Sequence, residues 1–271
     1  MAKTITIDTG KCIHCGMCVK DCFLGCLEFD ENKNPRFNAQ GADQCVGCQH
    51  CLSICPTGAL TFCDKKPENS AKVTLGNSED LLGIIKSRRS IRAYKNQDIP
   101  QEKFDKIKEM LAYAPTGVNA DSLHFSIVES KDKMDEIRKL THEKILADTN
   151  AANDMIWAFC QNGIKNGLDI VYRGAPSMVA VSVDKSKAAA GCENIDPIIA
   201  LSYLDLYAHS LGLGTLWCDI AFFAAEKYPE VMQALQIPAG FELNFIMLLG
   251  IPAVKYQRTP QPEAFRMSIV K

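Results

Sequence analysis

Two cysteine runs with identical spacing lie within the first sixty residues and constrain the fold more than any other feature of the chain. The first run, C-x2-C-x2-C-x3-C, consists of Cys12, Cys15, Cys18 and Cys22. The second run begins 33 residues later and consists of Cys45, Cys48, Cys51 and Cys55. The residues after each run also correspond, as Gly25, Leu27 and Phe29 match Gly58, Leu60 and Phe62. The segment is therefore a duplicated unit.

This cysteine spacing is typical of iron–sulfur ligation. Three thiolates spaced by two residues can surround one cluster within a single loop, while the fourth points away and ligates the other cluster of a pair. The sequence therefore predicts two [4Fe–4S] clusters that exchange their fourth ligands. The ligands predicted for the first cluster are Cys12, Cys15, Cys18 and Cys55. The ligands predicted for the second are Cys45, Cys48, Cys51 and Cys22.

Structural zinc is the alternative for these thiols. Zinc sites usually carry pairs of ligands rather than triplets with a trailing fourth, so the spacing favours iron–sulfur clusters. His14 and His50 lie inside the runs. Because all eight cysteines are present, neither imidazole is needed as a ligand, and we expect both to face solvent.

Residues 1 to about 64 resemble a bacterial two-cluster ferredoxin in all eight cysteines and in Pro56 after the last of them. The first copy departs from the pattern, with Phe23 at the position that corresponds to Pro56. Cys26 stands where the second copy has Ala59, so we expect it to be a small buried residue. A module of this size buries little apolar core, and the clusters would supply the cross-linking.

Composition excludes several classes of protein. The 271 residues include 13 cysteines, ten of them before residue 64, and no export signal is visible. An odd count without such a signal favours metal binding in a reducing cytoplasm over a disulfide framework. The formal net charge of -2 argues against binding to nucleic acid through bulk positive charge. No apolar run is long enough to span a membrane. We therefore expect a cytoplasmic protein with neither nucleic acid nor membrane as a partner.

Polar residues and Pro67 mark 65–78 as a linker between a domain at 1–64 and a domain at 79–271. In the second domain, Asn77 or Ser78 is expected to cap a helix, since Glu79 and Asp80 would lie in its favourable first turn. Further helices are predicted at 100–113, 131–140, irregularly at 143–171, and at 198–211. The last of these is apolar nearly all round, which predicts a buried helix. Strands are predicted at 125–129, 177–183 and 241–249, the second of them nearly continuously apolar and therefore central.

The segment Ser87-Arg-Arg-Ser-Ile-Arg92 places three guanidinium groups and two hydroxyl groups within six residues. Because arginine presents paired donors to phosphate oxygens, the segment could hold a phosphate. The alternative is a solvated helix end, and composition alone leaves both open. The chain has no G-x-G-x-x-G after its first strand and no phosphate-binding loop of the G-x-x-x-x-G-K-[ST] type.

Four segments resemble, in order, the sequence signatures of the nitroreductase family of FMN enzymes. They are 88–94, 114–125, 211–217, and 249–252 followed by Lys255 and Arg258. The second segment departs from the usual pattern at three positions, Asp121, Ser122 and Leu123. The resemblance implies an α+β chain in which a two-cluster ferredoxin-like domain precedes a nitroreductase-like α/β sandwich, a mixed sheet flanked by helices.

The same resemblance implies roles for single residues at the FMN phosphate and ribityl chain. These would be held by Arg88, Ser90 and Arg92, with support from Arg89 and with Arg258 and Lys255 completing the phosphate cage. Asn119 would hydrogen-bond the isoalloxazine or ribityl group.

At the flavin ring, Asp219 with Ile220 matches the position whose backbone N–H approaches N5. Pro115 and Thr116 would line the side of the neighbouring subunit, because this family binds FMN at a homodimer interface. No dedicated acid–base residue is required, so none is named as catalytic.

Three aromatic residues, Trp157, Phe159 and Tyr172, could line a substrate pocket or pack in the core, and the sequence leaves both open. Trp217 is interpreted as a core residue and His124 as a structural histidine.

A ferredoxin-like and a flavin domain on one chain imply an electron path, because clusters carry single electrons while flavin accepts one or two. Electrons from NAD(P)H or from an external donor protein would reach a small electron-poor acceptor such as a nitroaromatic, a quinone or an activated alkene. One alternative is an electron carrier or redox sensor that serves a partner protein. Others are a dehalogenating or flavin-destroying enzyme, and a zinc-stapled binding protein.

Overall fold

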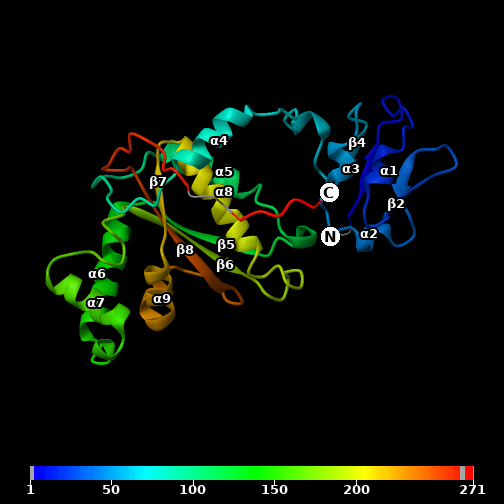
Figure 1. Cartoon of the computed structure of the whole chain (residues 1–271). Helices are drawn as coiled ribbons and strands as arrows, with labels where there is room; N and C mark the ends of the chain where they lie inside the picture. Colours follow the sequence, from blue (N-terminus) through cyan, green and yellow to red (C-terminus); the bar gives the residue numbers. More distant parts are fainter. Residues whose placement is uncertain (1–2, 263–265, 271) are drawn as a thin grey trace. The chain divides into compact units, whose positions relative to one another are not determined.

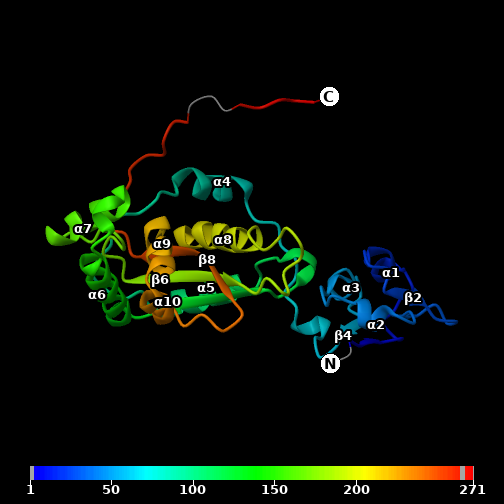
Figure 2. The same ribbon diagram turned by 90° about the horizontal axis from the view of Figure 1, so that it is seen from below.

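The computed structural model describes residues 3–262 and 266–270 (Figures 1 and 2). The chain forms two compact units. One comprises Met1–Leu75 and Val118–Ala120, and the other comprises Gly76–Gly117 and Asp121–Lys271. In the part of the chain that the structure describes, none of the helices combines the length and the apolar character that crossing a membrane requires.

The N-terminal unit is built from short elements that repeat with the sequence. Its helices are α1 (Met17–Asp21), α2 (Gly41–Gln44) and α3 (His50–Ser53), and a 3-10 turn, η1 (Pro67–Asn69), follows them. Its strands form two antiparallel pairs, β1 (Ile5–Ile7) with β4 (Leu60–Phe62) and β2 (Leu27–Phe29) with β3 (Pro35–Phe37). The elements α1 and β2 of the first copy thus correspond to α3 and β4 of the second.

The backbone repeats the duplication at the turns that shape each cysteine loop. Gly16 before α1 and Gln49 before α3 both adopt the left-handed conformation, with φ of 72° and 61°. Gly25 and Gly58 each have a φ of 63° after the fourth cysteine of their run. Glycine adopts this region without a Cβ penalty, which explains its presence at three of these four positions.

The larger unit alternates helices and strands. Its helices are α4 (Ser78–Ser87), α5 (Gln101–Leu111), α6 (Lys131–Ala147), α7 (Met155–Lys165), α8 (Asp196–Ser210), α9 (Asp219–Lys227) and α10 (Pro229–Ala234), with 3-10 turns η2 (Gly117–Asn119) and η3 (Ala151–Asn153). Its strands are β5 (Leu123–Val128), β6 (Ser177–Val183), β7 (Gly214–Trp217) and β8 (Glu242–Gly250).

The four strands form one sheet in the order β5-β6-β8-β7. The three ladders are antiparallel, and an isolated parallel bridge joins Ser90 to Thr215 of β7. All seven residues of β6 are buried between β5 and β8, which confirms the prediction of a central strand and explains its continuous apolar run.

Helices cover both faces of this sheet (Figure 1), and the side chains along β6 alternate between two cores. Val179 and Val181 face one core, which α5 and α8 complete. Met178 and Ala180 face the other core, to which α6, α7, α9 and α10 contribute. The α+β class and the helix-flanked sheet predicted from the sequence are confirmed.

The predicted elements agree with the observed ones where the apolar period was strong. The Asn77 side chain accepts the backbone N–H of Glu79 at 3.0 Å and caps α4, as expected. The amphipathic helix expected at 131–140 continues to Ala147 in α6. The elements α9 and α10 were not predicted, because helices of nine and six residues are too short to show a clear amphipathic period.

A half-buried ion cluster joins α6 to the loop before β6. The Asp169 carboxylate lies 2.8 Å from Arg138 Nε and 3.1 Å from His142 Nε2, and it accepts the backbone N–H groups of Tyr172 and Gly174. Burial opposes ionisation, but these hydrogen bonds and the Arg138 charge lower the pKa of Asp169 from 3.8 to about 2.

We therefore expect Asp169→Asn to reduce the free energy of unfolding by about 2 kcal/mol at pH 7. Because the pKa is lowered in the folded state, this stabilisation is complete above pH 3.8 and is lost as the pH falls toward 2. Chemical unfolding followed by tryptophan fluorescence tests it, since both tryptophans lie in the larger unit. The exposed Glu143→Gln on the same helix is the control, and equal stabilities for the two variants at pH 7 would contradict the account.

Candidate functional site

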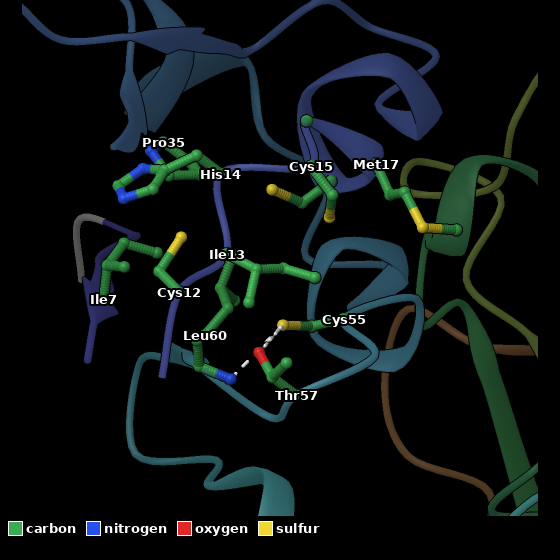
Figure 3. A pocket seen from close by; sticks show the side chains of 13 residues that line it. Ile7, Cys12, Ile13, His14, Cys15, Met17, Pro35, Cys55, Thr57 and Leu60 are labelled. Carbon is green, nitrogen blue, oxygen red and sulfur yellow. Dashed lines mark hydrogen bonds between the residues drawn. The ribbon is translucent and has the colours of Figure 1, made fainter. Parts of the chain in front are cut away.

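Four cysteines from the two runs line one cavity in the N-terminal unit. Its lining includes Cys12, Cys15 and Cys18 of the first run and Cys55, the last cysteine of the second run. Figure 3 shows the sulfur atoms of Cys12, Cys15 and Cys55 around the same space, with the apolar side chains of Ile7, Ile13 and Leu60 beside them. The structure thus brings together the four residues predicted for the first cluster.

Hydrogen-bond donors are aimed at the sulfur atoms of both fourth cysteines. The backbone N–H of Ala59 donates to Cys55 Sγ at 3.2 Å, and that of Cys26 donates to Cys22 Sγ at 3.3 Å, the equivalent position of the first copy. Burial raises the pKa of the Cys55 thiol, but the bonds from Ala59 and Thr57 outweigh it and hold the pKa below its usual value. N–H groups of this kind stabilise sulfur ligands of a metal cluster.

The thiols predicted for the second cluster lie around α3. Burial raises the pKa of Cys51 to about 11, and the neighbouring thiols of Cys45 and Cys48 add to the shift. The Gly47 N–H lies 3.4 Å from Cys45 Sγ. The apolar lining around the first set of thiols and the N–H donors at sulfur in both sets are chemically suited to iron–sulfur clusters.

Three residues of this unit that were not assigned as ligands lie where the sequence placed them. Cys26 is 1% exposed, so the expectation of a small buried residue is confirmed. Burial raises the pKa of its thiol to about 11, with Cys22 nearby as a further cause. His14 and His50 are exposed, as expected, and their ring nitrogens contact the Lys33 carbonyl and the Asp21 carboxylate.

In the larger unit, three of the cations predicted for phosphate binding line one cavity of about 440 Å³. They are Arg89, Lys255 and Arg258, and Ser87 and His209 line the same cavity. The His209 ring is held by Ser87, with 2.8 Å between Nε2 and Oγ. Two guanidinium groups and an ammonium around one cavity fit the anionic phosphate of a flavin mononucleotide.

The other residues of the predicted cradle are placed differently, and none of them is among the residues lining that cavity. The Arg88 side chain approaches the buried carboxylate of Asp205, at 3.3 Å between Nη1 and Oδ2. Ser90 pairs with Thr215 of β7, and the side chain of Arg92 is exposed. The two neighbouring arginines therefore have different surroundings, the Asp205 carboxylate for Arg88 and the cavity for Arg89.

The segment from Pro115 to Asp121 has an unusual backbone. Val118, Asn119 and Asp121 have φ values of 49°, 55° and 49°, in the left-handed region, which asparagine and aspartate tolerate but a β-branched valine rarely adopts. Two side chains fix its ends: the buried Asp196 accepts the Gly117 N–H at 2.9 Å, and Thr116 Oγ1 accepts the Asp121 N–H at 3.3 Å. Strained backbone of this kind is common at binding sites. Pro115 and Asn119 are exposed, and Thr116 is half-buried.

Asp219 and Ile220 form the first turn of α9, directly after β7. The Asp219 carboxylate accepts the Ile220 N–H at 2.9 Å. The N-terminal position on a helix leaves backbone N–H groups free of intrahelical partners, which suits contact with a polar ring edge.

The remaining aromatic candidates separate by burial. Tyr172 is 1% exposed and hydrogen-bonds Thr141, so it is a core residue. Trp157 is 6% exposed and packs edge-on against Tyr228, but it also lines a cavity of about 420 Å³. Phe159 is 55% exposed. Trp217 is half-buried against Phe245. His124 lies on β5 and contacts Ser126 and Phe241, in agreement with a structural role.

Asp205 is the residue of this region that the sequence analysis missed. It lies 6% exposed on α8, within a helix that was interpreted as apolar nearly all round. The sequence did contain a signal that could have identified it. An aspartate in the middle of an apolar helix indicates a buried charge, and a buried charge requires a partner.

Comparison with known proteins connects both units to described families. Residues 5–62 match a 4Fe-4S dicluster domain, and residues 85–251 match the Nitroreductase family. An FMN-bound nitroreductase structure from Bacteroides fragilis is 25% identical, with a TM-score of 0.60 over 72% of this chain and 100% of that one.

Relatives of known annotation have names that agree with this family match. A putative NADH dehydrogenase/NAD(P)H nitroreductase of Methanothermobacter thermautotrophicus is 26% identical over 64% of this chain and 78% of its own length. An FMN reductase [NAD(P)H] of Bacillus subtilis is 26% identical over 67% of this chain and 70% of its own length. The match at 85–251 spans more than half of the chain. The chain, with its 4Fe-4S dicluster domain, therefore belongs to the nitroreductase family of FMN oxidoreductases.

Proposed function

We propose that the chain is a nitroreductase-type enzyme in which electrons enter at two [4Fe–4S] clusters, pass to FMN and reduce a small electron-poor acceptor. The acceptor would be a nitroaromatic, a quinone or an activated alkene. The observation that carries this proposal is the cavity lined by Cys12, Cys15, Cys18 and Cys55 on the same chain as a nitroreductase domain. Bound clusters supply single electrons, and bound flavin supplies a two-electron reductant.

The chain's own residues would bind and orient these groups. The eight cysteines of the two runs would hold the clusters, and backbone N–H groups would tune them through hydrogen bonds to sulfur. At the larger unit, Arg89, Lys255 and Arg258 would bind the FMN phosphate in the cavity they share. Arg88, Ser90 and Arg92 would complete this end from the adjoining segment.

The flavin ring would be bound by Asn119 and by the Asp219–Ile220 turn at the start of α9. Pro115 and Thr116 would contact the FMN of a second subunit, which makes the functional unit a homodimer. The fixed, strained segment around Asn119 supports this assignment, because it presents polar side chains on a backbone that cannot readily relax.

Anaerobic turnover of 4-nitrobenzoate tests the proposed function. The full chain, loaded with iron, sulfide and FMN, is supplied with electrons either from NADH or NADPH, or from a reduced ferredoxin. We expect catalytic loss of the nitro compound with at least one donor. Stoichiometric rather than catalytic reduction, with rapid electron transfer to a protein acceptor, would instead support an electron carrier. The donor that sustains turnover identifies the entry point of the electrons.

A further inference from the structure

Asp205 is a buried carboxylate that accepts two side-chain hydrogen bonds and forms one ion pair. Trp217 Nε1 donates to Oδ2 at 3.1 Å, Thr215 Oγ1 donates to Oδ1, and Arg88 Nη1 lies 3.3 Å from Oδ2. The Asp205 side chain is 8% exposed, whereas that of Arg88 is 33% exposed. One edge of the guanidinium is therefore fixed inside the protein while part of the group reaches solvent.

The surrounding contacts hold Arg88 from two directions. Asp205 and His209 are four residues apart on α8 and so share one face of that helix. His209 binds Ser87 at the end of α4, and Asp205 binds Arg88, the next residue. Beyond it, the Ile91 N–H donates to the Thr215 carbonyl at 2.8 Å. Arg88 thus lies in a short segment anchored at both ends.

We propose that Asp205 is a positioning residue that holds the Arg88 guanidinium ready for the phosphate of FMN and so makes the site select phosphorylated flavin. The inference rests on the proposed function. An arginine has five N–H donors in a planar fork, so one edge can bind the carboxylate while the other binds a phosphate. Without its partner, Arg88 would have to lose rotamer freedom when the phosphate binds.

The same carboxylate also connects the two ends of the proposed flavin site. Thr215 and Trp217 are alternate residues of β7, which ends directly before Cys218 and the Asp219–Ile220 turn. Their side chains leave the same face of the strand and meet Asp205 together. Asp205 thus holds β7, which leads to the turn proposed to contact the flavin ring. It also holds Arg88, which is proposed to contact the FMN phosphate.

Binding of FMN and of riboflavin to the full chain, with its clusters in place and its flavin removed, tests this role. The two ligands differ only in the phosphate, so their ratio of Kd values isolates that contact. We expect Asp205→Asn to lower the preference for FMN about five- to tenfold, the scale of ordering one long side chain. The Kd of riboflavin should change little. In an Arg88→Ala background, Asp205→Asn should not alter the ratio further.

Asp196→Asn is the matched control, because Asp196 is buried on the same helix and binds the Gly117 backbone rather than an arginine. It should leave the ratio unchanged. Thr215→Val keeps the Asp205 charge but removes one donor, and a smaller loss of preference is expected from it if Asp205→Asn does not fold.

Equal weakening of both flavins by Asp205→Asn, or tighter FMN binding, would overturn the positioning role. If the wild-type chain prefers FMN and Asp205→Asn shows the same preference, that result would overturn this inference alone. A wild-type chain that binds neither flavin would overturn the proposed function and this inference with it.

Discussion

Replacing Cys18 with alanine is expected to remove about half of the iron, that is, about four of about eight irons per chain. Cys18 lies on α1, is 8% exposed and lines the cavity that Cys12, Cys15 and Cys55 share. A cluster with three of its four thiolates loses one iron–sulfur bond, and no spare cysteine follows Cys55, since Ala59 stands at the position equivalent to Cys26. Iron and sulfide assays on anaerobically reconstituted protein measure the loss.

Cys26→Ala is the matched control for this experiment. Cys26 is also buried in the N-terminal unit, but its sequence position corresponds to Ala59, and the repeat assigns it no cluster. Its replacement should leave the iron content unchanged. Full iron in Cys18→Ala, or loss of iron in Cys26→Ala, would contradict the assignment of the ligands.

Arg89→Ala is expected to weaken FMN binding by about 10- to 100-fold, because a hydrogen bond to a charged group contributes about 1.5–3 kcal/mol. Arg89 is one of three cations that line the cavity of about 440 Å³, together with Lys255 and Arg258. Its guanidinium also donates to the Lys86 carbonyl at 3.0 Å, which orients it at the end of α4. Quenching of flavin fluorescence on binding measures the change.

Lys86→Ala removes a positive charge from the same helix end without touching the cavity lining, since the Lys86 side chain is exposed. We expect its FMN affinity to fall by less than about threefold, as for a surface charge screened by salt. Equal losses in Lys86→Ala and Arg89→Ala would show that general positive charge, rather than the cavity, binds the phosphate. That outcome would remove the structural basis of the proposed phosphate site.

The N-terminal unit was the part of the fold most accessible from sequence. The exact 33-residue repeat predicts equivalent turns, and the left-handed residues Gly16 and Gln49 and the N–H groups at Cys22 and Cys55 occur at equivalent positions. Local spacing alone determines such loops. The ligand assignment itself stays a prediction until the iron of single variants is measured.

The flavin region was less accessible because its geometry depends on contacts between distant segments. The sequence grouped Arg88, Arg89 and Arg92 as one cradle, but it could not show that Arg88 pairs with Asp205 while Arg89 lines a cavity with Lys255 and Arg258. These pairings are set by the packing of α4 on α8 and by the C-terminal segment after β8. Periodicity along one segment carries no information about such neighbours.

Helix α8 shows the same limit in detail. Its apolar composition predicted burial on nearly all sides, and Ala200, Leu201 and Leu204 are buried. Ile198 and Tyr203, however, are 38% and 46% exposed. Asp205 is buried among the apolar residues because Thr215, Trp217 and Arg88 satisfy its oxygens, an arrangement that a hydrophobic pattern cannot reveal.

An anaerobic dithionite titration of freshly purified full chain, followed by absorbance, tests the central claim most directly, with iron and flavin assayed on the same sample. The account predicts about eight irons and about one FMN per chain, with bleaching of the clusters coupled to reduction of the flavin. Iron without flavin, or flavin reduced independently of the clusters, would contradict an internal electron path between the two units.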